Sequence, residues 1–349
     1  MQLPNFFSGK RIFLTGHTGF KGGWLCHVLH NFGAVVTGVA LEPEAKSFFQ
    51  SCNTREIVNH NIADINDYKN LENILRRAQP DIIIHAAAQP LVRLSYETPL
   101  ETLQTNIMGT ANVLMAAHAS QEHPLVAIVT SDKCYENIET NTPYVETDRM
   151  GGHDPYSASK GAAEIVTASL AKSFYNKNAQ SVLSLRGGNV IGGGDWATDR
   201  IMTDIIEALI VNRAPVIRSP QALRPWQHIL DVLSGYLSAI MYVSQQTPGS
   251  FEQFNIGPFS ENEASVSKLA CYACDYWGNG IKPDISSAQA DLHEAKLLKL
   301  DISKAVEKLD WKPKFSFEET VRKTVDWYKA ESEGEDMASF TMQQISEYF

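Results

Sequence analysis

The 349-residue sequence is poor in basic residues, with 30 lysines and arginines against 40 aspartates and glutamates and a net charge of -10. Surfaces that bind nucleic acids need clustered Lys and Arg to neutralise phosphates. The deficit therefore argues against a nucleic-acid partner. Any phosphate that the protein binds must be held by local arginines or by backbone amides.

Long apolar runs are also missing. No stretch approaches the ~18 consecutive apolar residues of a membrane-spanning helix, and residues 1–7 do not join a basic segment to an apolar one, as a secretory signal would. We therefore expect no membrane partner and a cytoplasmic location.

Cysteine is scarce and scattered, with five residues in the chain. An odd, scattered set favours free thiols in a reducing compartment. Cys271 and Cys274 form a C-x-x-C motif without the second pair that a zinc site requires. Their stretch has helical apolar spacing, so we expect buried helix cysteines and no metal site.

What the sequence does contain is an alternation of apolar, β-rich runs and helical patterns. Continuous apolar runs are typical of parallel strands that helices cover on both faces. The alternation predicts an α/β fold, a Rossmann-like doubly wound parallel sheet. The expected strands are 11–14, 35–40, 81–85, 126–130 and 181–185, and the expected helices are 24–32, 68–77, 100–119 and 156–174. After residue 186 this rhythm breaks into glycine-rich and proline-rich pieces, which predicts a smaller, loop-rich C-terminal lobe with a last helix from residue 317 to about 329.

Three glycines, Gly16, Gly19 and Gly22, follow the first strand. A triphosphate-binding loop would continue with Lys and then Ser or Thr, but Gly and Trp follow here, which excludes that site. The pattern G-x-x-G-x-x-G then leaves a dinucleotide-binding turn or a plain strand-to-helix turn. Glu42, after the second strand, is available for the adenosine ribose, and no Arg follows that strand immediately, which favours NAD over NADP.

A second motif, Tyr156-x-x-x-Lys160, follows the helix-start signal of Asp154 and Pro155. Four residues place Tyr156 and Lys160 on one helical face. A tyrosine with an ordinary pKa near ~10 is a poor base at neutral pH unless a cation stabilises its phenolate. Lys160 would supply that cation, so that Tyr156 removes a proton from a hydroxyl group while hydride leaves the same carbon.

A glycine turn of this kind with a later Y-x-x-x-K helix resembles the extended short-chain dehydrogenase/reductases. Further similar segments lie at 85–89, 105–110, 185–192 and 224–231. The resemblance implies tightly bound NAD that each cycle regenerates, and a division into an NAD-binding domain at 1–186, with a returning segment near 227–257, and a mainly nucleotide-sugar-binding lobe at 187–349. The implied cofactor-binding residues are Gly16, Thr18, Gly19, Phe20, Gly22, Asp64, Ile65, Ala86, Ala87, Ala88, Asn106, Tyr156 and Lys160.

The segment Ser131-Asp132-Lys133 narrows the reaction. Taken alone, Asp132 and Lys133 could form a salt bridge at a strand end, but ligands of doubly wound sheets bind where strands end. At the position of Ser131, epimerases of this family have a hydroxyl residue, and no pair of ionisable residues follows it. In nucleotide-sugar 4,6-dehydratases the hydroxyl residue is followed by Asp and usually by Glu. Here Lys133 stands where Glu is usual. In this feature, and in its segments 16–22 and 193–200, the sequence resembles the dehydratases that act on CDP-glucose.

The resemblance implies a mechanism for the residues of this sequence. Tyr156 deprotonates the sugar C4 hydroxyl, beside which Ser131 donates a hydrogen bond, and Asp132 protonates the departing C6 hydroxyl. Lys133 either removes the C5 proton or stabilises the enolate. The product would be a 4-keto-6-deoxy sugar for deoxysugar biosynthesis of the O-antigen type.

Substrate binding is predicted in the smaller lobe and at one loop of the sheet. Arginines suit a diphosphate because they offer planar, bidentate donors, and a structural histidine is the alternative for His228. The predicted substrate-binding residues are Gln89, Asn189, Arg218, Arg224, His228 and Glu294. The resemblance also implies a homodimer, or a tetramer built from two dimers, formed by the long helices that bear Asn106 and Tyr156. The alternatives are a nucleotide-sugar 4-epimerase, a 4,6-dehydratase for another nucleotide sugar, and a non-catalytic dinucleotide sensor.

Overall fold

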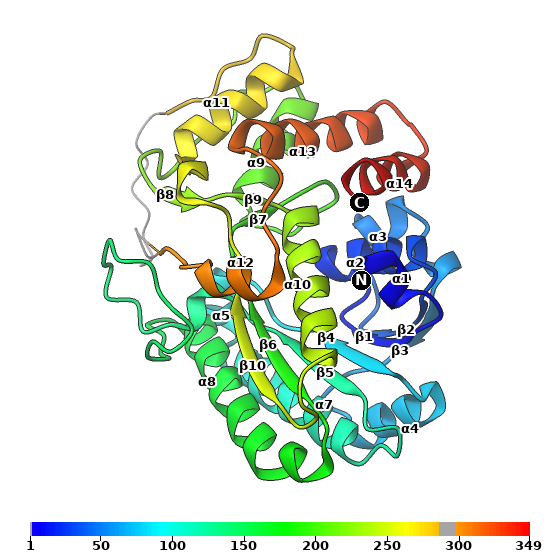
Figure 1. Ribbon diagram of the computed structural model, residues 1–349. Coiled ribbons are helices and arrows are strands. Elements are labelled where there is room, and N and C mark those ends of the chain that lie inside the picture. The colour runs from blue at the N-terminus through cyan, green and yellow to red at the C-terminus, as the bar shows by residue number, and fades with distance from the viewer. Residues whose placement is uncertain (1, 286–297) are drawn as a thin grey trace.

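Seven parallel strands form the central sheet of the computed structural model, which describes residues 2–285 and 298–349 (Figure 1). The strand order is β10-β6-β5-β4-β1-β2-β3, and every neighbouring pair is parallel. The predicted doubly wound α/β fold is therefore confirmed. The strands are β1 (Arg11–Thr15), β2 (Val35–Ala40), β3 (Asn59–Ile62), β4 (Ile82–His85), β5 (Leu125–Val129), β6 (Val182–Arg186) and β10 (Phe251–Asn255).

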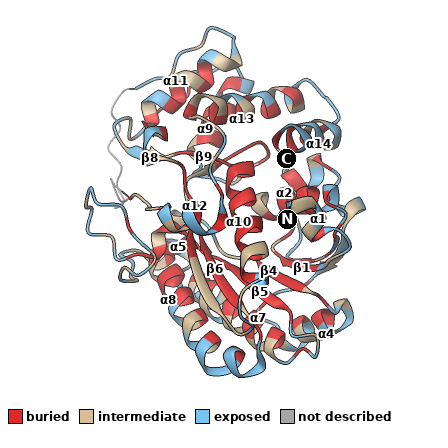
Figure 2. Cartoon of the chain, in the orientation of Figure 1, coloured by how far each residue is buried: buried red, intermediate tan, exposed pale blue. Residues whose placement is uncertain are grey.

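Helices cover both faces of this sheet because successive strand residues point to opposite sides. Ile12 and Leu14 pack in the core beneath α2 and α10, whereas Phe13 packs with α4 and α7 on the other face. Figure 2 shows buried residues along the central strands and along α10. The helices of this part are α1 (Leu3–Phe7), α2 (Phe20–Asn31), α3 (Phe48–Ser51), η1 (Thr54–Ile57), α4 (Tyr68–Ala78), α5 (Val92–Glu97), α8 (Pro155–Leu170), η4 (Ala171–Tyr175), η5 (Asn176–Asn178) and α10 (Ile229–Ser244).

The predicted helix at 100–119 is divided into three segments. These are α6 (Pro99–Leu103), the π-helical turn η2 (Gln104–Met108) and α7 (Gly109–His118). Asn106 in the π turn donates from Nδ2 to the Ser159 hydroxyl at 2.8 Å and accepts from the Gln89 amide at 2.8 Å. Single π turns are frequent at functional sites, and this one turns a polar side chain inward toward α8.

The smaller lobe begins after β6 and lies at the end of the sheet where the parallel strands terminate (Figure 1). Two short ribbons support it, β7 with β9 and β8 with β11. Its elements are β7 (Val190–Ile191), α9 (Ile201–Ile210), β8 (Leu223–Pro225), β9 (Gln227–His228), η6 (Ser260–Asn262), β11 (Glu263–Ser265), α11 (Val266–Trp277), α13 (Phe317–Ser332) and α14 (Met337–Tyr348). The helix α12 (Ser303–Leu309) instead packs against α10 and β10 of the sheet part.

The last two helices tie the lobe to the sheet. The side chain of Ser316 caps α13 and Glu319 completes a capping box, which fixes the start of the predicted C-terminal helix. The following helix, α14, packs against α2 beside the first strand. The chain therefore ends next to the part of the fold in which it begins.

Three expectations concerned metals, cysteines and membranes. In the described residues, Cys274 is buried and Cys271 half-buried in α11, and both are free thiols. No group of three His, Cys, Asp or Glu that could hold a metal occurs within these ranges. Each helix among residues 2–285 and 298–349 is too short or too polar to span a bilayer.

Candidate active site

A cavity of about 970 Å³ lies between the sheet and the smaller lobe. The carboxyl ends of parallel strands meet at one edge, and ligands of doubly wound sheets bind there. Loops after β1, β2, β4, β5 and β6 all line this cavity. The predicted residues on its wall are Gly16, Thr18, Gly19, Phe20, Gly22, Asp64, Ile65, Ala86, Ala87, Ala88, Ser131, Asp132, Lys133, Tyr156, Lys160, Asn189, Arg218 and Arg224.

The glycine turn forms one side of the cavity. Gly16 has φ +78, and a Cβ there would lie 2.7 Å from the Ala87 backbone nitrogen. A Cβ at Gly22 would lie 2.1 Å from the Gly16 carbonyl oxygen. Neither position accepts a side chain, so the N-terminus of α2 packs directly on the turn and presents its free amides and positive dipole end to an anion.

Tyr156 and Lys160 enter the cavity from the first turns of α8. Asp154 caps this helix, as predicted, by accepting a hydrogen bond from the Ser157 amide at 2.9 Å. Burial raises the pKa of Tyr156 to about 12, and a hydrogen bond with Ser131 opposes that rise. The Lys160 ammonium lies 5.9 Å from the centre of the Tyr156 ring, where a positive charge favours the phenolate.

The catalytic candidates of the β5 loop occupy a single 3₁₀ turn, η3 (Asp132–Cys134). The Ser131 hydroxyl caps this turn by accepting from the Lys133 amide at 3.2 Å, and donates to Asp132 Oδ1 at 2.8 Å. Asn189 donates from Nδ2 to Asp132 Oδ2 at 3.1 Å. Asp132 and Lys133 therefore do not pair with each other in a hydrogen bond or ion pair among the described contacts, and both face the same cavity as Tyr156.

A buried ion pair lies beneath this turn. Arg186 at the end of β6 donates from Nη2 to Glu164 Oε2 at 2.8 Å, and both side chains are at most 1% exposed. Glu164, one turn beyond Lys160, also accepts from the Thr130 hydroxyl at 2.5 Å. This network joins the helix that carries Tyr156 to the strand that precedes Ser131.

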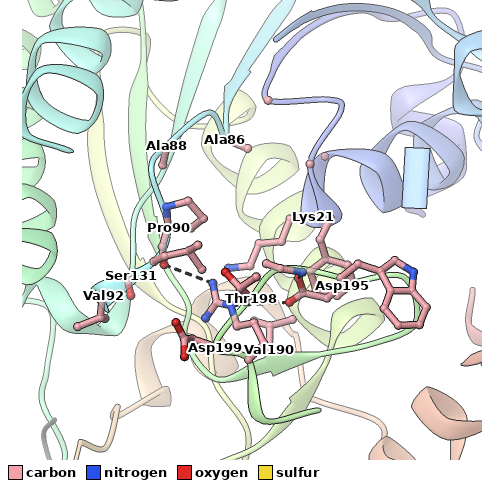
Figure 3. A pocket seen from close by; sticks show the side chains of 18 of the residues that line it. Lys21, Ala86, Ala88, Pro90, Val92, Ser131, Val190, Asp195, Thr198 and Asp199 are labelled. Carbon is pink, nitrogen blue, oxygen red and sulfur yellow. Dashed lines mark hydrogen bonds and ion pairs between the residues drawn. The ribbon is translucent and has the colours of Figure 1, made fainter. Parts of the chain in front are cut away.

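Two cavity residues, Lys21 and Arg200, were not predicted from the sequence. Figure 3 shows Lys21 beside Asp195. Burial, with nearby Arg200, lowers the pKa of Lys21 to about 8. Burial also raises the pKa of Asp195 on the glycine-rich loop. A lysine in the first turn of a helix opposes the helix dipole, and this was the signal in the sequence that could have singled out Lys21.

Residues 195–200 connect the two sides of the cavity. Arg200 donates from Nη2 to the Pro90 carbonyl at 3.3 Å, the dashed line in Figure 3, and its Nε lies 3.9 Å from Asp195. Asp199 lies 3.4 Å from Arg93 and 3.6 Å from Arg218. Polar contacts from this loop therefore reach both the sheet side and the smaller lobe.

The structure does not bring three predicted residues to the cavity wall. His228 is fully buried between the rings of Trp24 and Phe315, and its Nδ1 accepts from the Leu230 amide as the cap of α10. Burial lowers its pKa to about 3. The Nδ1 atom thus has a structural role as a helix cap, while Nε2 is buried without a hydrogen-bond partner among the described residues, and substrate binding by His228 stays a prediction.

Gln89 and Asn106 are the other two residues set back from the wall. Gln89 donates from Nε2 to the Thr102 hydroxyl at 2.8 Å, and Asn106 holds the Gln89 backbone and Ser159. Both side chains are therefore engaged in fixing the loop after β4 against α6 and α8. Glu294 lies outside the described residues.

The buried cation of Lys160 should reduce the stability of the protein. Burial, and then the charge of Lys21, lower the pKa of Lys160 to about 8 from 10.5. At 1.36 kcal/mol per pKa unit this corresponds to about 3 kcal/mol. We therefore expect Lys160→Met to raise the free energy of unfolding of the ligand-free protein at pH 7, while it removes activity.

The sign of the pH dependence follows from proton binding. Between pH 8 and 10.5 the unfolded chain keeps the Lys160 proton that the folded protein has lost, so wild-type stability rises with pH. Urea unfolding at several pH values should show the advantage of Lys160→Met complete below pH 8 and shrinking above it. Lys172→Met, at an exposed lysine in η4, the segment that directly follows α8, is the control and should show no such trend.

A doubly wound sheet of this order, with a glycine turn after β1 and a Tyr-x-x-x-Lys helix beside the β5 loop, defines an extended short-chain dehydrogenase/reductase. Solved structures agree on the fold. An epimerase from Methanothermobacter thermautotrophicus superposes with TM-score 0.81 at 22% identity, covering 95% of both chains. A dTDP-glucose 4,6-dehydratase from Bacillus anthracis in complex with NAD gives TM-score 0.76 at 18% identity, covering 95% of this chain and 99% of that one.

Sequence comparisons place the chain more narrowly. The family model for GDP-mannose 4,6 dehydratase matches residues 13–324. CDP-glucose 4,6-dehydratase from Salmonella typhimurium is 42% identical over 350 residues, covering 99% of this chain and 97% of the relative. A dTDP-glucose 4,6-dehydratase from Xanthomonas campestris is 26% identical over 90% of this chain and 92% of its own length. The chain belongs to this family of nucleotide-sugar 4,6-dehydratases.

Proposed function

We propose that the protein converts CDP-glucose to CDP-4-dehydro-6-deoxyglucose with NAD as its cofactor. The observation that carries the proposal is the meeting of Tyr156, Asp132 and Lys133 in one cavity with the glycine turn. An epimerase needs only the tyrosine, whereas the loss of water across C5 and C6 also needs an acid and a base. The 42% identity to a dehydratase of CDP-glucose supports the choice of substrate.

The cavity wall fits a dinucleotide. Gly16 and Gly22 leave the backbone bare at the start of α2, where a pyrophosphate would accept amide hydrogen bonds. Asp64 and Ile65 follow β3 on the same wall, at the position expected for an adenine, and Ala86–Ala88, which follow β4, line the wall as well. When bound, NAD would take hydride from C4 of the sugar and return it to C6. Its tight retention through the cycle remains a prediction.

The protein's own residues would move three protons. Tyr156, as phenolate beside Lys160, removes the proton of the C4 hydroxyl while Ser131 holds that oxygen. The resulting C4 ketone acidifies C5–H, whose proton Lys133 removes or whose enolate it stabilises. Asp132 gives its proton to the C6 hydroxyl, the C6–O bond breaks and water leaves. Arg218 and Arg224 would hold the diphosphate, and Asn189 would orient both Asp132 and the substrate.

The decisive experiment separates C4 oxidation from the loss of water. Asp132→Asn and Lys133→Met should each lower formation of the 4-keto-6-deoxy sugar by about 10²–10⁴-fold, the usual contribution of a general acid or base. Reduced nicotinamide should still form on mixing with CDP-glucose, because oxidation at C4 does not need these groups. Rapid-mixing absorbance and mass spectrometry of the sugar measure the two events.

The surface variant Asp275→Asn, 59% exposed at its side chain, is the control and should behave as wild type. Normal keto-sugar formation by both Asp132→Asn and Lys133→Met would contradict the proposal, and a 4-epimer as the product would replace it with an epimerase. A panel of CDP, dTDP, UDP and GDP sugars tests the nucleotide.

We also propose that two copies associate through the outer face of α6–α7 and α8. Large apolar side chains are exposed on these neighbouring helices, namely Leu100 at 77%, Ile165 at 59% and Met108 at 48%. Covering such a patch is a common reason for association.

Wild-type protein should sediment at about twice the chain mass of 38.7 kDa, and Ile165→Glu should sediment as a monomer. Val211→Glu, at an exposed valine of the smaller lobe, should leave the mass unchanged; a wild-type monomer would refute the dimer.

A further inference from the structure

A second, smaller cavity lies behind Asp132. It has a volume of about 260 Å³ and reaches from Asp132 and Gln227 to Asn141 and Ser260. Of the described residues, Asp132 and Gly188 are the two that line both cavities. The proposed catalytic acid therefore stands between the main cavity and a separate space.

The inner end of this small cavity is polar and incompletely paired. Gln227 is 1% exposed, and its Nε2 donates to the Gly188 carbonyl at 2.6 Å and to the Ile256 carbonyl at 3.3 Å. Its Oε1 accepts no hydrogen bond from any group in residues 2–285 and 298–349. A buried carbonyl oxygen without a partner costs about 1–3 kcal/mol, and water is the usual partner where a polar cavity adjoins such an atom.

The outer end of the cavity opens at the protein surface. Asn141 and Ser260 on its wall are exposed, whereas Asp132 at the other end is 2% exposed. Between them the wall includes the ion pair of Lys299 with Glu263, 2.8 Å apart. A line of polar groups thus leads from the carboxylate of Asp132 to solvent without passing through the main cavity.

We propose that this cavity is a water site that receives the water molecule expelled from C6 and releases it to solvent. The inference rests on the proposed function. In that step the Asp132 O–H bond, the C5–H bond and the C6–O bond break, the C5 proton passes to the base, for which Lys133 is the candidate, and water and the C5=C6 double bond form. A dinucleotide and a nucleotide sugar together would occupy the main cavity, so the expelled water needs another route. At ~30 Å³ per molecule in the liquid, the small cavity has room for several waters.

Retained water would slow the reaction in a specific way. Water left beside the C5=C6 bond can add back, which reverses the elimination and delays the return of hydride to C6. Oxidation at C4 comes earlier and forms no water. Blocking the cavity should therefore leave the formation of reduced nicotinamide unchanged and slow its disappearance.

Gly257 provides a plug with a matched control. It lines the small cavity, and a Cβ there would lie 3.4 Å from Ile302 and 3.8 Å from Leu300, which also lines the cavity, both ordinary contacts. Gly257→Leu should slow the disappearance of reduced nicotinamide by about tenfold, whereas Gly257→Ala should match wild type. Ser260→Trp, at the exposed end, gives a second plug that does not disturb the core. Disappearance at the wild-type rate in both plugged variants would overturn the proposal.

A crystal structure of the wild-type protein supplies a readout that needs no turnover. Ordered water should bridge Gln227 Oε1 and the Asp132 carboxylate and continue toward Ser260. A dry cavity would overturn this proposal while leaving the proposed function intact. If instead the wild-type protein forms no keto sugar, the proposed function and the exit role both fail, even where water is seen.

Discussion

Tyr156→Phe is expected to lower turnover of CDP-glucose by about 10²–10⁴-fold, the range of general acid–base catalysis. Phe keeps the ring in its buried place on α8 but removes the only atom that would accept the C4 proton. Hydride transfer from C4 depends on that proton transfer, so reduced nicotinamide should not form on mixing. The Asp132→Asn variant should differ in this measurement, because C4 is still oxidised and reduced nicotinamide still forms.

Affinity for NAD distinguishes a chemical defect from a folding defect. Calorimetric titration should give Tyr156→Phe the affinity of wild type, because the pyrophosphate site on the glycine turn is untouched. Tyr96→Phe, at a partly exposed tyrosine of α5 that does not line the cavity, is the control and should keep full turnover. Wild-type rates of nicotinamide reduction in Tyr156→Phe would remove Tyr156 from the mechanism.

Arg186→Met should cost about 3–5 kcal/mol of unfolding free energy, the usual effect of removing one member of a buried ion pair. Met replaces the volume but leaves the Glu164 carboxylate, 1% exposed, without its cation. It also takes a donor from the Tyr135 hydroxyl, which accepts from Arg186 Nη1 at 2.8 Å. Urea unfolding of the purified variant measures the loss.

An exposed ion pair gives the comparison for Arg186→Met. Lys282 and Asp275 are paired with side chains 70% and 59% exposed, and Lys282→Met should change the unfolding free energy by less than about 1 kcal/mol. The double variant Arg186→Met/Glu164→Gln should recover part of the loss, since no carboxylate is then buried alone. A loss of under 1 kcal/mol in Arg186→Met would show that the buried pair is not a determinant of stability.

Most of the sheet could be predicted because its strands are continuous apolar runs buried on both faces. The sequence did not predict the strand β3 (Asn59–Ile62), because β3 is not an apolar run. Its sequence, Asn-His-Asn-Ile, is polar, and it lies at the edge of the sheet with two of its four residues exposed. Its place depends on pairing with β2, a long-range contact that no local pattern encodes.

The residues of the candidate site also fall into two groups, those that a local sequence motif predicts and those that only long-range contacts bring to the cavity. Tyr156, Lys160 and the Ser131–Lys133 turn carry local motifs, and the structure brings them together. Arg200 becomes a cavity residue only through tertiary approach, since it reaches Pro90 over 110 positions of sequence, whereas Lys21 lies within the glycine turn itself and its position in the first turn of a helix is a local signal. His228 shows the converse, because its motif position predicts a ligand contact, whereas the fold buries the ring between Trp24 and Phe315 and uses its Nδ1 as a helix cap.

The return of β10 to the sheet beside β6 limits how this enzyme can be re-engineered. The smaller lobe is not formed by one continuous segment of chain. Residues 229–255 separate two parts of the lobe along the sequence, but they form α10 and β10, which belong to the sheet. A chimaera cut once after β6 would strip β6 of its outer neighbour and uncover the apolar face that α10 fills. A graft of the lobe therefore needs at least two junctions, on either side of residues 229–255.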